Sequence, residues 1–508
     1  MIEVRTQNKK KGTFDNITFR LSYRILQMLF NSYVFILIFF PIVCISYYLI
    51  NIYAKNKVKL LNAFILVASL VFYAYAGIKS CIIILLVTGW NYLLFRLIIY
   101  SINWKMLWKR YLLILGVCTN LLVLMYFKYY NFFIGTINIF GKKQFSTKDI
   151  IAPLGISFLV FQQIAFLVDA SRNEIKKCSL IEYCTYVLFF PHVSSGPILL
   201  HNDLMPILRS VRKVDWDNIA SGIYLFVMGL GKKVLIADML AEAVDWGYAN
   251  LEGINSTSAI WITILYTLQI YFDFSGYSDM AIGISRVLQM DLPVNFNSPY
   301  KSKTILEFWD RWHITLTRFF TKYLYIPLGG NRKGALRTYA NTMIVFILSG
   351  LWHGASYTFI LWGFLHGCFM VITKKFIKFF NKLPNWVNQT MTLLFVNFTW
   401  ILFRAGSLGT FKAMLLAIAK CDWGNLENSL CQPFVPGFFT YQNNTVFMQI
   451  WAVAVVLVLF FVVLRCKNVE EWAGNRKHTF LSCIAVIIIA VVCVLSFGGV
   501  NSFIYLNF

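Results

Sequence analysis

Long apolar runs separated by short basic segments dominate this chain. A helix needs about 20 apolar residues to cross the roughly 30 Å hydrocarbon core of a bilayer. Runs of spanning length cover residues 29–50, 58–77, 80–101, 111–127, 219–236, 256–272, 338–352, 356–373, 387–403, 448–464 and 479–499. Less apolar or shorter runs near 150–170, 180–200, 274–290 and 304–328 are candidates for re-entrant or half-spanning segments.

The spanning elements are predicted to be helices. Backbone polar groups in lipid must be satisfied within the protein, and the runs lack the alternation typical of a barrel strand. The pattern therefore predicts an all-α polytopic membrane protein with roughly a dozen helices. Composition agrees, because 58% hydrophobic and only 13% charged residues over 508 positions exclude a water-soluble globule.

The excess of basic residues indicates orientation. The net charge is +24, and in a membrane protein this excess does not imply nucleic acid. By the positive-inside rule, the basic loops after residues 50, 101 and 373 are cytoplasmic. Segment 405–447, whose only basic residues are Lys412 and Lys420, is predicted to face outward, and so is the C-terminus.

The middle of the chain has a different pattern from its flanks. Between residues 150 and 370, glycine, proline, asparagine and charged residues interrupt the apolar runs, which is tolerated only where they line protein or water. We therefore predict a cavity-forming core at 150–370, with membrane helices at 28–149 and 371–508 as its walls. Residues 1–27 are a basic extension or an upstream start added to a chain that begins at Met28.

Several kinds of site find no support. The eleven cysteines form no C-x-x-C pair, so neither a metal site nor a disulfide framework is predicted. Cys421 and Cys431 share the predicted outer segment, which leaves a disulfide between them open. There is no G-x-S-x-G, H-E-x-x-H or phosphate-binding G-x-x-x-x-G-K-[ST] motif, so a serine esterase, a metalloprotease or a nucleotide-driven pump has no local support.

Two histidines are the candidate reactive groups. His353 lies within an apolar run, where ionisable side chains usually face a polar cavity or reaction path. Its neighbours Gly350, Gly354 and Ala355 are small, which favours open space beside the ring over simple helix packing. His313 comes forty residues earlier among charged residues, where a solvated histidine would also be ordinary.

A basic segment surrounds His313. From Lys301 to Arg337, eight lysines and arginines alternate with aromatic residues such as Trp309 and Trp312, and a glycine turn follows Pro327. An anionic substrate could bind there. Positive-inside bias alone would also produce such a cluster.

A series of short motifs runs through the chain: 153–158 (PLGISF), 161–162 (FQ), 168–169 (VD), 190–192 (FPH), 196–197 (GP), 229–233 (GLGKK), 273–279 (DFSGYSD), 295–300 (NFNSPY), 307–313 (EFWDRWH), 323–332 (YLYIPLGGNR) and 350–355 (GLWHGA). Taken together, these motifs resemble the membrane-bound O-acyltransferase family, and within it the bacterial alginate O-acetyltransferase-like subgroup. The resemblance covers nearly the whole length from Met28.

The resemblance implies helices around a central funnel or tunnel that holds a catalytic pair of histidines. His353 matches the principal catalytic histidine and His313 the second active-site residue. The imidazole of His353 could act as general base on a hydroxyl or could itself carry the acyl group. Residues expected to contact substrate are Trp309, Arg311, Trp312, Tyr323, Asn331, Arg332, Trp352, Asp273 and Tyr277.

The resemblance also implies reactants and partners. The expected donor is acetyl-CoA or an acyl-carrier thioester, with its phosphates on the basic segment and no permanently bound cofactor. The expected acceptor is a polysaccharide outside the bacterial cytoplasmic membrane. The chain has no soluble domain for acceptor chemistry, so an extracytoplasmic partner resembling SGNH esterases is expected. D-alanyl transfer toward teichoic acid and, from another class, transport of lipid or polysaccharide remain alternatives.

Overall fold

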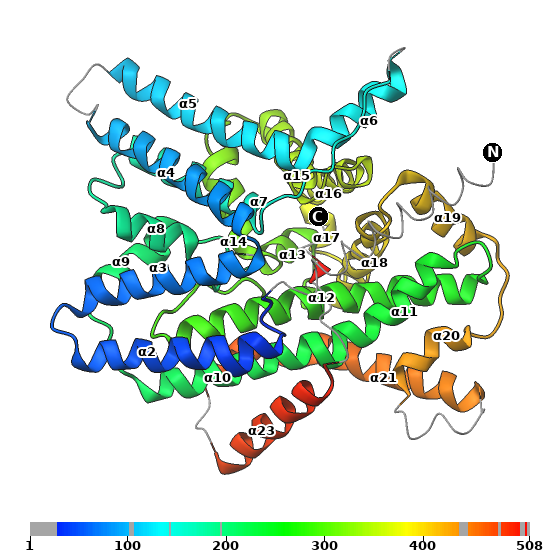
Figure 1. The fold of residues 1–508 in the computed structure, drawn as a ribbon. Coiled ribbons are helices and arrows are strands. Elements are labelled where there is room, and N and C mark those ends of the chain that lie inside the picture. The colour runs from blue at the N-terminus through cyan, green and yellow to red at the C-terminus, as the bar shows by residue number, and fades with distance from the viewer. Residues whose placement is uncertain are drawn as a thin grey trace, which may run out of the picture.

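The computed structural model describes residues 28–100, 106–141, 144–193, 196–435, 445–475, 479–497 and 503–504 (Figure 1). The basic extension predicted at 1–27 lies outside these ranges. All regular secondary structure in the described ranges is helical, which confirms the all-α prediction. There are about twenty helical segments, more than the dozen expected, because short helices connect the long ones.

The α-helices of the first half are α2 (Phe40–Tyr53), α3 (Lys57–Ala76), α4 (Ile78–Tyr100), α5 (Met106–Leu124), α6 (Tyr130–Phe140), α7 (Ile156–Ser171), α8 (Leu180–Leu188), α9 (His201–Arg209), α10 (Trp216–Gly231), α11 (Asp238–Ala249) and α12 (Ser256–Val287). Those of the second half are α13 (Ile305–Arg311), α14 (Ile314–Phe320), α15 (Ala335–His353), α16 (Tyr357–Lys375), α17 (Ile377–Phe380), α18 (Asn385–Arg404), α19 (Leu408–Ala419), α20 (Asn428–Cys431), α21 (Thr445–Arg465), α22 (Val469–Asn475) and α23 (Phe480–Leu495). Adjoining them are the π-helical segments η1 (Val34–Phe39), η3 (Met125–Tyr129), η4 (Lys232–Ala237) and η6 (Thr321–Tyr325), and the short 3₁₀ helices η5 (Pro299–Lys301) and η7 (Gln432–Phe434).

Seven helices in the described part of the chain are long and apolar enough to cross a membrane, so the protein is a multi-pass membrane protein. Their outer surfaces carry exposed aliphatic side chains such as Leu37, Ile42 and Leu86, which suits contact with lipid. The candidate spans are Val34–Tyr53, Lys57–Ala76, Ile78–Tyr100, Leu107–Ile139, Trp216–Ala249, Tyr357–Lys375 and Thr445–Arg465.

One boundary predicted from the sequence is wrong. The runs 256–272 and 274–290 were expected to be separate elements, but α12 is a single helix of 32 residues through Asp273 and Asp279. Lys233 Nζ lies 2.7 Å from Asp273 Oδ1, and Lys232 Nζ lies 2.6 Å from Asp279 Oδ2. Because both carboxylates are paired, the polar residues do not interrupt the helix.

Helices α10 and α12 form the central pair of the molecule, side by side across the middle of Figure 1. Glycines allow their close approach. A methyl group on Gly229 would lie 2.6 Å from the carbonyl oxygen of Gly276, and one on Gly283 would lie 2.6 Å from that of Gly222. Small residues at such contacts bring backbones together, as is common between membrane helices.

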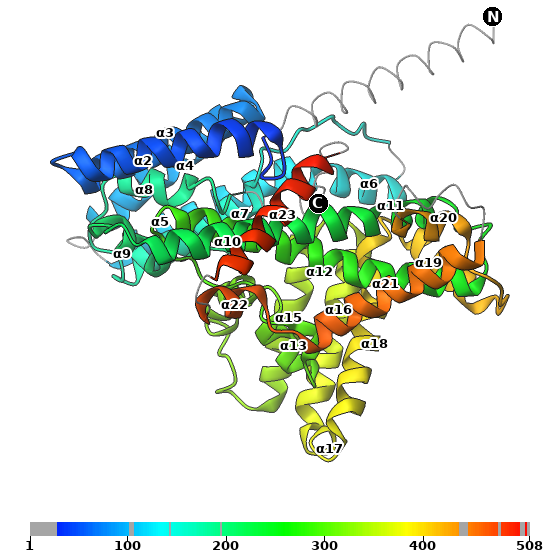
Figure 2. The same cartoon turned by 90° about the horizontal axis from the view of Figure 1, so that it is seen from below.

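A second layer crosses this central pair. In Figure 2, α15, α16 and α18 extend steeply away from the direction of α10 and α12, with α17 at their far end. The short helices α13 and α14, both labelled in Figure 1, lie where the two layers meet, because His313 between them packs on Phe274 of α12 and on His353 of α15. The sequence places His313 immediately before α14 and His353 at the end of α15, so both histidines belong to this junction.

All eleven cysteines are free. The disulfide left open between Cys421 and Cys431 is therefore not formed: the first side chain is exposed and the second is buried.

Candidate active site

His353 is the last residue of α15, and aromatic rings enclose it. Its exposed fraction is 3%. The ring centroids of Trp352, Trp362 and Phe403 lie 5.1, 5.2 and 5.2 Å from that of His353. The structure thus confirms a deeply buried imidazole and places several aromatic rings beside it.

The space expected at Gly350 and Gly354 is filled by α16. A methyl group on Gly350 would lie 2.2 Å from the carbonyl oxygen of Phe359, and one on Gly354 would lie 2.1 Å from the Phe359 ring. These glycines serve the close packing of α15 against α16. A path for substrate to His353 must therefore come from another side of the ring.

His313 has an unusual backbone conformation, and the side chain and backbone of Asn295 help to hold it. Its φ is +47°, in the left-handed region, which costs a residue other than glycine roughly 1–3 kcal/mol. Asn295 offsets this cost, since its side-chain oxygen lies 3.1 Å from His313 Nδ1 and its backbone oxygen accepts from Ile314 N at 3.0 Å. The same side-chain oxygen accepts from the Thr315 hydroxyl at 2.9 Å. Asn295 lies in a motif of the sequence but was not predicted as a site residue.

The two histidines face one another across the junction of the molecule's two layers. Their ring centroids are 6.5 Å apart, a separation at which both can contact one small reacting group. His313 packs on Phe274 of α12 at 4.8 Å and on Phe158 of α7 at 6.4 Å. The residues around the pair therefore come from helices that are distant in sequence.

A cavity of about 380 Å³ lies on one side of the pair. Two of its lining residues, Leu316 and Thr317, donate their backbone amides to the carbonyl oxygen of His313 at 3.0 and 3.1 Å, and a third, Ser349, lies one turn before His353 on α15. The cavity thus lies beside the backbone that carries the two histidines, neither of which lines it. It is lined by Leu306, Trp309, Asp310, Leu316, Thr317, Phe320, Thr321, Tyr325, Thr342, Val345, Phe346, Ser349, Met370 and Lys374.

The predicted tryptophans divide into two groups. Trp352 lies beside the pair, 5.1 Å from His353 and 6.2 Å from His313 between ring centroids, and Trp309 lines the cavity. Trp312 instead belongs to the hydrophobic core, 1% exposed and 5.0 Å from the ring of Trp400.

Three other predicted residues have structural partners. Asp273 forms the ion pair with Lys233 already described. Tyr277 stacks on Phe30 at 5.0 Å. Arg311 lies on α13 and pairs with Glu307 at 2.9 Å. Their predicted contact with substrate stays a prediction.

The predicted residues of the 323–332 motif have another buried partner or are exposed. The Tyr323 hydroxyl donates to Asp169 Oδ2 at 2.6 Å, which ties η6 to α7. Asn331 and Arg332 are exposed in the turn before α15. The turn contains Gly329 and Gly330, both with positive φ, which agrees with the glycine turn expected there.

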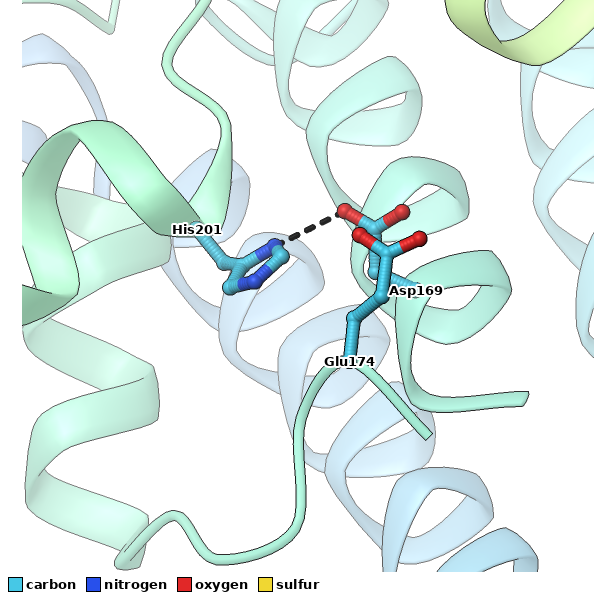
Figure 3. Close-up of side chains that lie close together, drawn as sticks. All are labelled: Asp169, Glu174 and His201. Atoms are coloured by element: carbon cyan, nitrogen blue, oxygen red, sulfur yellow. Dashed lines mark hydrogen bonds and ion pairs between the residues drawn. The ribbon is translucent and has the colours of Figure 1, made fainter. Parts of the chain in front are cut away.

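Asp169 belongs to a cluster that resembles a metal site (Figure 3). Ligand atoms of Asp169, Glu174 and His201 lie within 4.8 Å of one another. Lys322 Nζ, however, lies 3.0 Å from Asp169 Oδ1 and 2.9 Å from Glu174 Oε2, and His201 Nδ1 lies 2.8 Å from Asp169 Oδ2. The ammonium of Lys322 thus occupies the space between both carboxylates, and the cluster links α7, α9 and η6.

Comparison with known proteins places this geometry in context. The family model described as "MBOAT, membrane-bound O-acyltransferase family" matches residues 16–414. A peptidoglycan O-acetyltransferase of Helicobacter pylori is 34% identical over 525 aligned positions, which cover 96% of this chain and 98% of that protein. The similarity therefore extends over both layers of the fold.

Two further relatives match over shorter lengths. A probable alginate O-acetylase of Pseudomonas putida is 38% identical and covers 78% of this chain and 81% of that protein. A teichoic acid D-alanyltransferase of Bacillus subtilis is 28% identical and covers 50% of this chain and 67% of that protein. Sequence identity is thus higher, and covers more of the chain, for the two relatives named as O-acetylating enzymes than for the D-alanyltransferase.

Proposed function

The chain belongs to the membrane-bound O-acyltransferase family, and we propose that it moves an acetyl group from a cytoplasmic thioester donor to a polysaccharide outside the bacterial cytoplasmic membrane. The observation that carries the proposal is the enclosed pair His313 and His353, 6.5 Å apart and both buried. Full-length similarity to a peptidoglycan O-acetyltransferase supports an acetyl group and a polysaccharide acceptor.

His353 is the proposed general base. It takes the proton of the acceptor hydroxyl while the hydroxyl oxygen bonds to the acyl carbon. The carbon–sulfur bond of the thioester then breaks, and the same proton passes to the departing thiolate. Enclosure by aromatic rings excludes water, which prevents hydrolysis of the thioester.

His313 is proposed to orient the reacting group. Because the Asn295 side-chain oxygen also accepts from Thr315, it is an acceptor toward His313 as well, so Nδ1 of His313 carries the proton. This hydrogen bond fixes the tautomer of the neutral ring. Oriented in this way, Nε2 is the nitrogen that meets substrate.

The cavity lined by Trp309 and Ser349 is the proposed donor entrance, and with it the cytoplasmic half of the predicted funnel. Lys374, one of its lining residues, lies in the last turn of α16, at the basic end that the charge pattern orients toward the cytoplasm. The exposed residues Arg332 and Lys333 are the members of the basic segment best suited to hold the phosphates of acetyl-CoA. Arg318 and Lys322 already pair with carboxylates.

The acceptor side is proposed to face the segment that contains α19 and α20, which the charge pattern orients outward. The described residues form no soluble domain there. An extracytoplasmic partner that resembles SGNH esterases would receive the acetyl group and transfer it to the polysaccharide. Peptidoglycan and an exopolysaccharide are the two acceptor classes that the named relatives suggest.

Replacing His353 tests the proposal. We expect His353→Ala to lower acetyl transfer from radiolabelled acetyl-CoA by about 10²–10⁴-fold, the usual contribution of a general base. Ester-linked acetate on peptidoglycan and on exopolysaccharide is measured in the same cells, and tells the two acceptors apart. Wild-type ester content in a His353→Ala strain would refute the proposal.

The matched control is His366→Ala. His366 is also buried and bonds Thr399 Oγ1 at 3.0 Å on the neighbouring helix, and we expect this variant to retain most of the activity. Transfer of D-alanine but not acetate by wild-type membranes would favour the D-alanyl alternative. Glycan or lipid transport that survives His353→Ala would favour a transporter.

A further inference from the structure

The end of α15 that carries His353 lacks part of its own hydrogen bonding. The last carbonyls of a helix have no amide of a following turn to bind. Here the Gly354 amide returns to Gly350 O at 3.4 Å, which leaves the carbonyls of Leu351, Trp352 and His353 to other donors. Inside a membrane such carbonyls need partners from the protein.

Two adjacent side chains of η3 supply those donors. Lys128 Nζ donates to Trp352 O at 2.6 Å and to His353 O at 3.1 Å. The Tyr129 hydroxyl donates to Leu351 O at 2.8 Å. Three consecutive carbonyls at the end of α15 are therefore bound by two consecutive residues from the junction of α5 and α6, which lies beside α15 in Figure 1.

The π-helical geometry of η3 explains how neighbouring residues reach the same target. In a regular α-helix consecutive side chains diverge by about 100°. A π-helical turn contains an extra residue and locally changes these directions, a feature that occurs often at functional sites. Residues Met125–Tyr129 form such a turn, so Lys128 and Tyr129 can both contact α15.

The surroundings of Lys128 contain acceptors but no acid. Besides the two carbonyls, Nζ lies 3.4 Å from Ser157 Oγ and 5.7 Å from the ring centroid of Trp352. Among the ion pairs of the described residues, none involves Lys128. A cation at the C-terminus of a helix is favourable, because the terminal carbonyls carry partial negative charge. The ammonium is thus held by the helix end itself.

We propose that Lys128 and Tyr129 are positioning residues that fix the last turn of α15 and, with it, the imidazole of His353. Lys128 binds the backbone carbonyl of His353 and also contacts the ring of Trp352, which packs 5.1 Å from the imidazole. The inference rests on the proposed function, because it takes His353 as the reacting group. It extends that function to a helix outside the predicted core at 150–370.

A series of substitutions at Lys128 tests the inference in the purified full-length protein. An arginine would keep charge and donors, a glutamine would keep donors alone, and a methionine would keep neither, so we compare Lys128→Arg, Lys128→Gln and Lys128→Met. We expect Lys128→Met to lower kcat by about 10–100-fold, the effect of a misplaced catalytic group. KM for acetyl-CoA should stay near its wild-type value, and Lys128→Arg should recover most of kcat. Tyr129→Phe, which removes one donor, should show a smaller loss of kcat.

Lys109→Met is the matched control. Lys109 lies on α5, and its Nζ donates to Asn173 Oδ1 at 2.7 Å rather than to α15, so its replacement should leave kcat unchanged. A Lys128→Met protein with kcat within twofold of wild type would overturn the inference. If Lys128→Met does not fold, Tyr129→Phe tests the inference instead. A wild-type kcat in Tyr129→Phe would then also overturn the positioning role. His353→Ala is measured in parallel: if it is active the proposed function fails, whereas an inactive His353→Ala with a fully active Lys128→Met rejects the positioning role alone.

Discussion

Buried lysines occur in two regions of this molecule, and their charges are balanced differently. In the α10–α12 pair, Lys233 lies between Asp273 at 2.7 Å and Asp238 at 2.8 Å, and Lys232 meets Asp279 at 2.6 Å. Beside the histidines, the partners of Lys128 among the described residues are carbonyls, a hydroxyl and an aromatic face. Both regions place their lysines on π-helical segments, η4 and η3.

This difference assigns a structural role to Lys232 and Lys233 and a role at the candidate active site to Lys128. Carboxylates neutralise Lys232 and Lys233 within the helix pair, so their charge acts mainly between α10 and α12. The charge of Lys128 is directed at the helix end that carries His353. Substitutions in the first region should therefore reduce stability, whereas those in the second should reduce turnover.

The largest expected effect on stability is that of Lys233→Met. Removing this ammonium leaves Asp273 and Asp238 facing each other without a cation, and breaking a buried ion pair costs about 3–5 kcal/mol. Thermal unfolding of the purified protein in detergent should show a strongly lowered midpoint. Lys420→Met is the control, since Lys420 and its partner Asp422 are more than half exposed. A midpoint reduced more by Lys128→Met than by Lys233→Met would remove the distinction between the two regions.

The helices were largely predictable from sequence because apolar runs of spanning length leave few alternatives. The ion pairs were not, since Lys233 and Asp273 are forty positions apart and a single sequence does not reveal which polar residues meet. For this reason the sequence pattern predicts a break at Asp273 that α12 does not have, whereas the substrate contact of Asp273 stays a prediction. Lys128 was also missed. The fourth predicted apolar run ends at residue 127, just before this charged residue, but the helices continue to Phe140.

The site itself was predicted in part. An ionisable residue within an apolar run pointed to His353, and the structure places His313 beside it. The meaning of Gly350 and Gly354 was missed, since small residues accommodate a ligand and a neighbouring helix equally well. The partner of Tyr323 was hidden for a similar reason, because Asp169 is 154 positions away.

A smaller loss of stability is expected from Gly350→Ala, which changes the packing of α15 in the region around His353. Its methyl group would lie 2.2 Å from the carbonyl oxygen of Phe359, so α15 and α16 must separate. Overpacking of this kind costs about 1–3 kcal/mol. Since His353 lies one turn further along α15, acetyl transfer should fall more than the unfolding midpoint alone explains.

Gly135→Ala is the control for this substitution. Gly135 is in α6, and a methyl group there meets no atom within 4 Å. We expect equal or slightly raised stability, because alanine favours a helix over glycine by about 1 kcal/mol. Full activity in a Gly350→Ala protein with a lowered midpoint would mean that the position of α15 does not control His353.

The smallest expected effect is on KM, from replacing exposed basic residues that lie outside both regions. Arg332 is exposed in the turn before α15, so Arg332→Ala should leave the unfolding midpoint and kcat unchanged. If its guanidinium holds a phosphate of acetyl-CoA, KM should rise by about twofold to fivefold, in line with an exposed ion pair. This difference should shrink as salt is raised, because exposed charges are screened. The exposed Lys412, on the segment predicted to face outward, provides the control: Lys412→Ala should not alter KM. An equal rise in KM for both variants would show that general surface charge attracts the donor, and a rise for Lys412→Ala alone would reverse the orientation inferred from the basic loops.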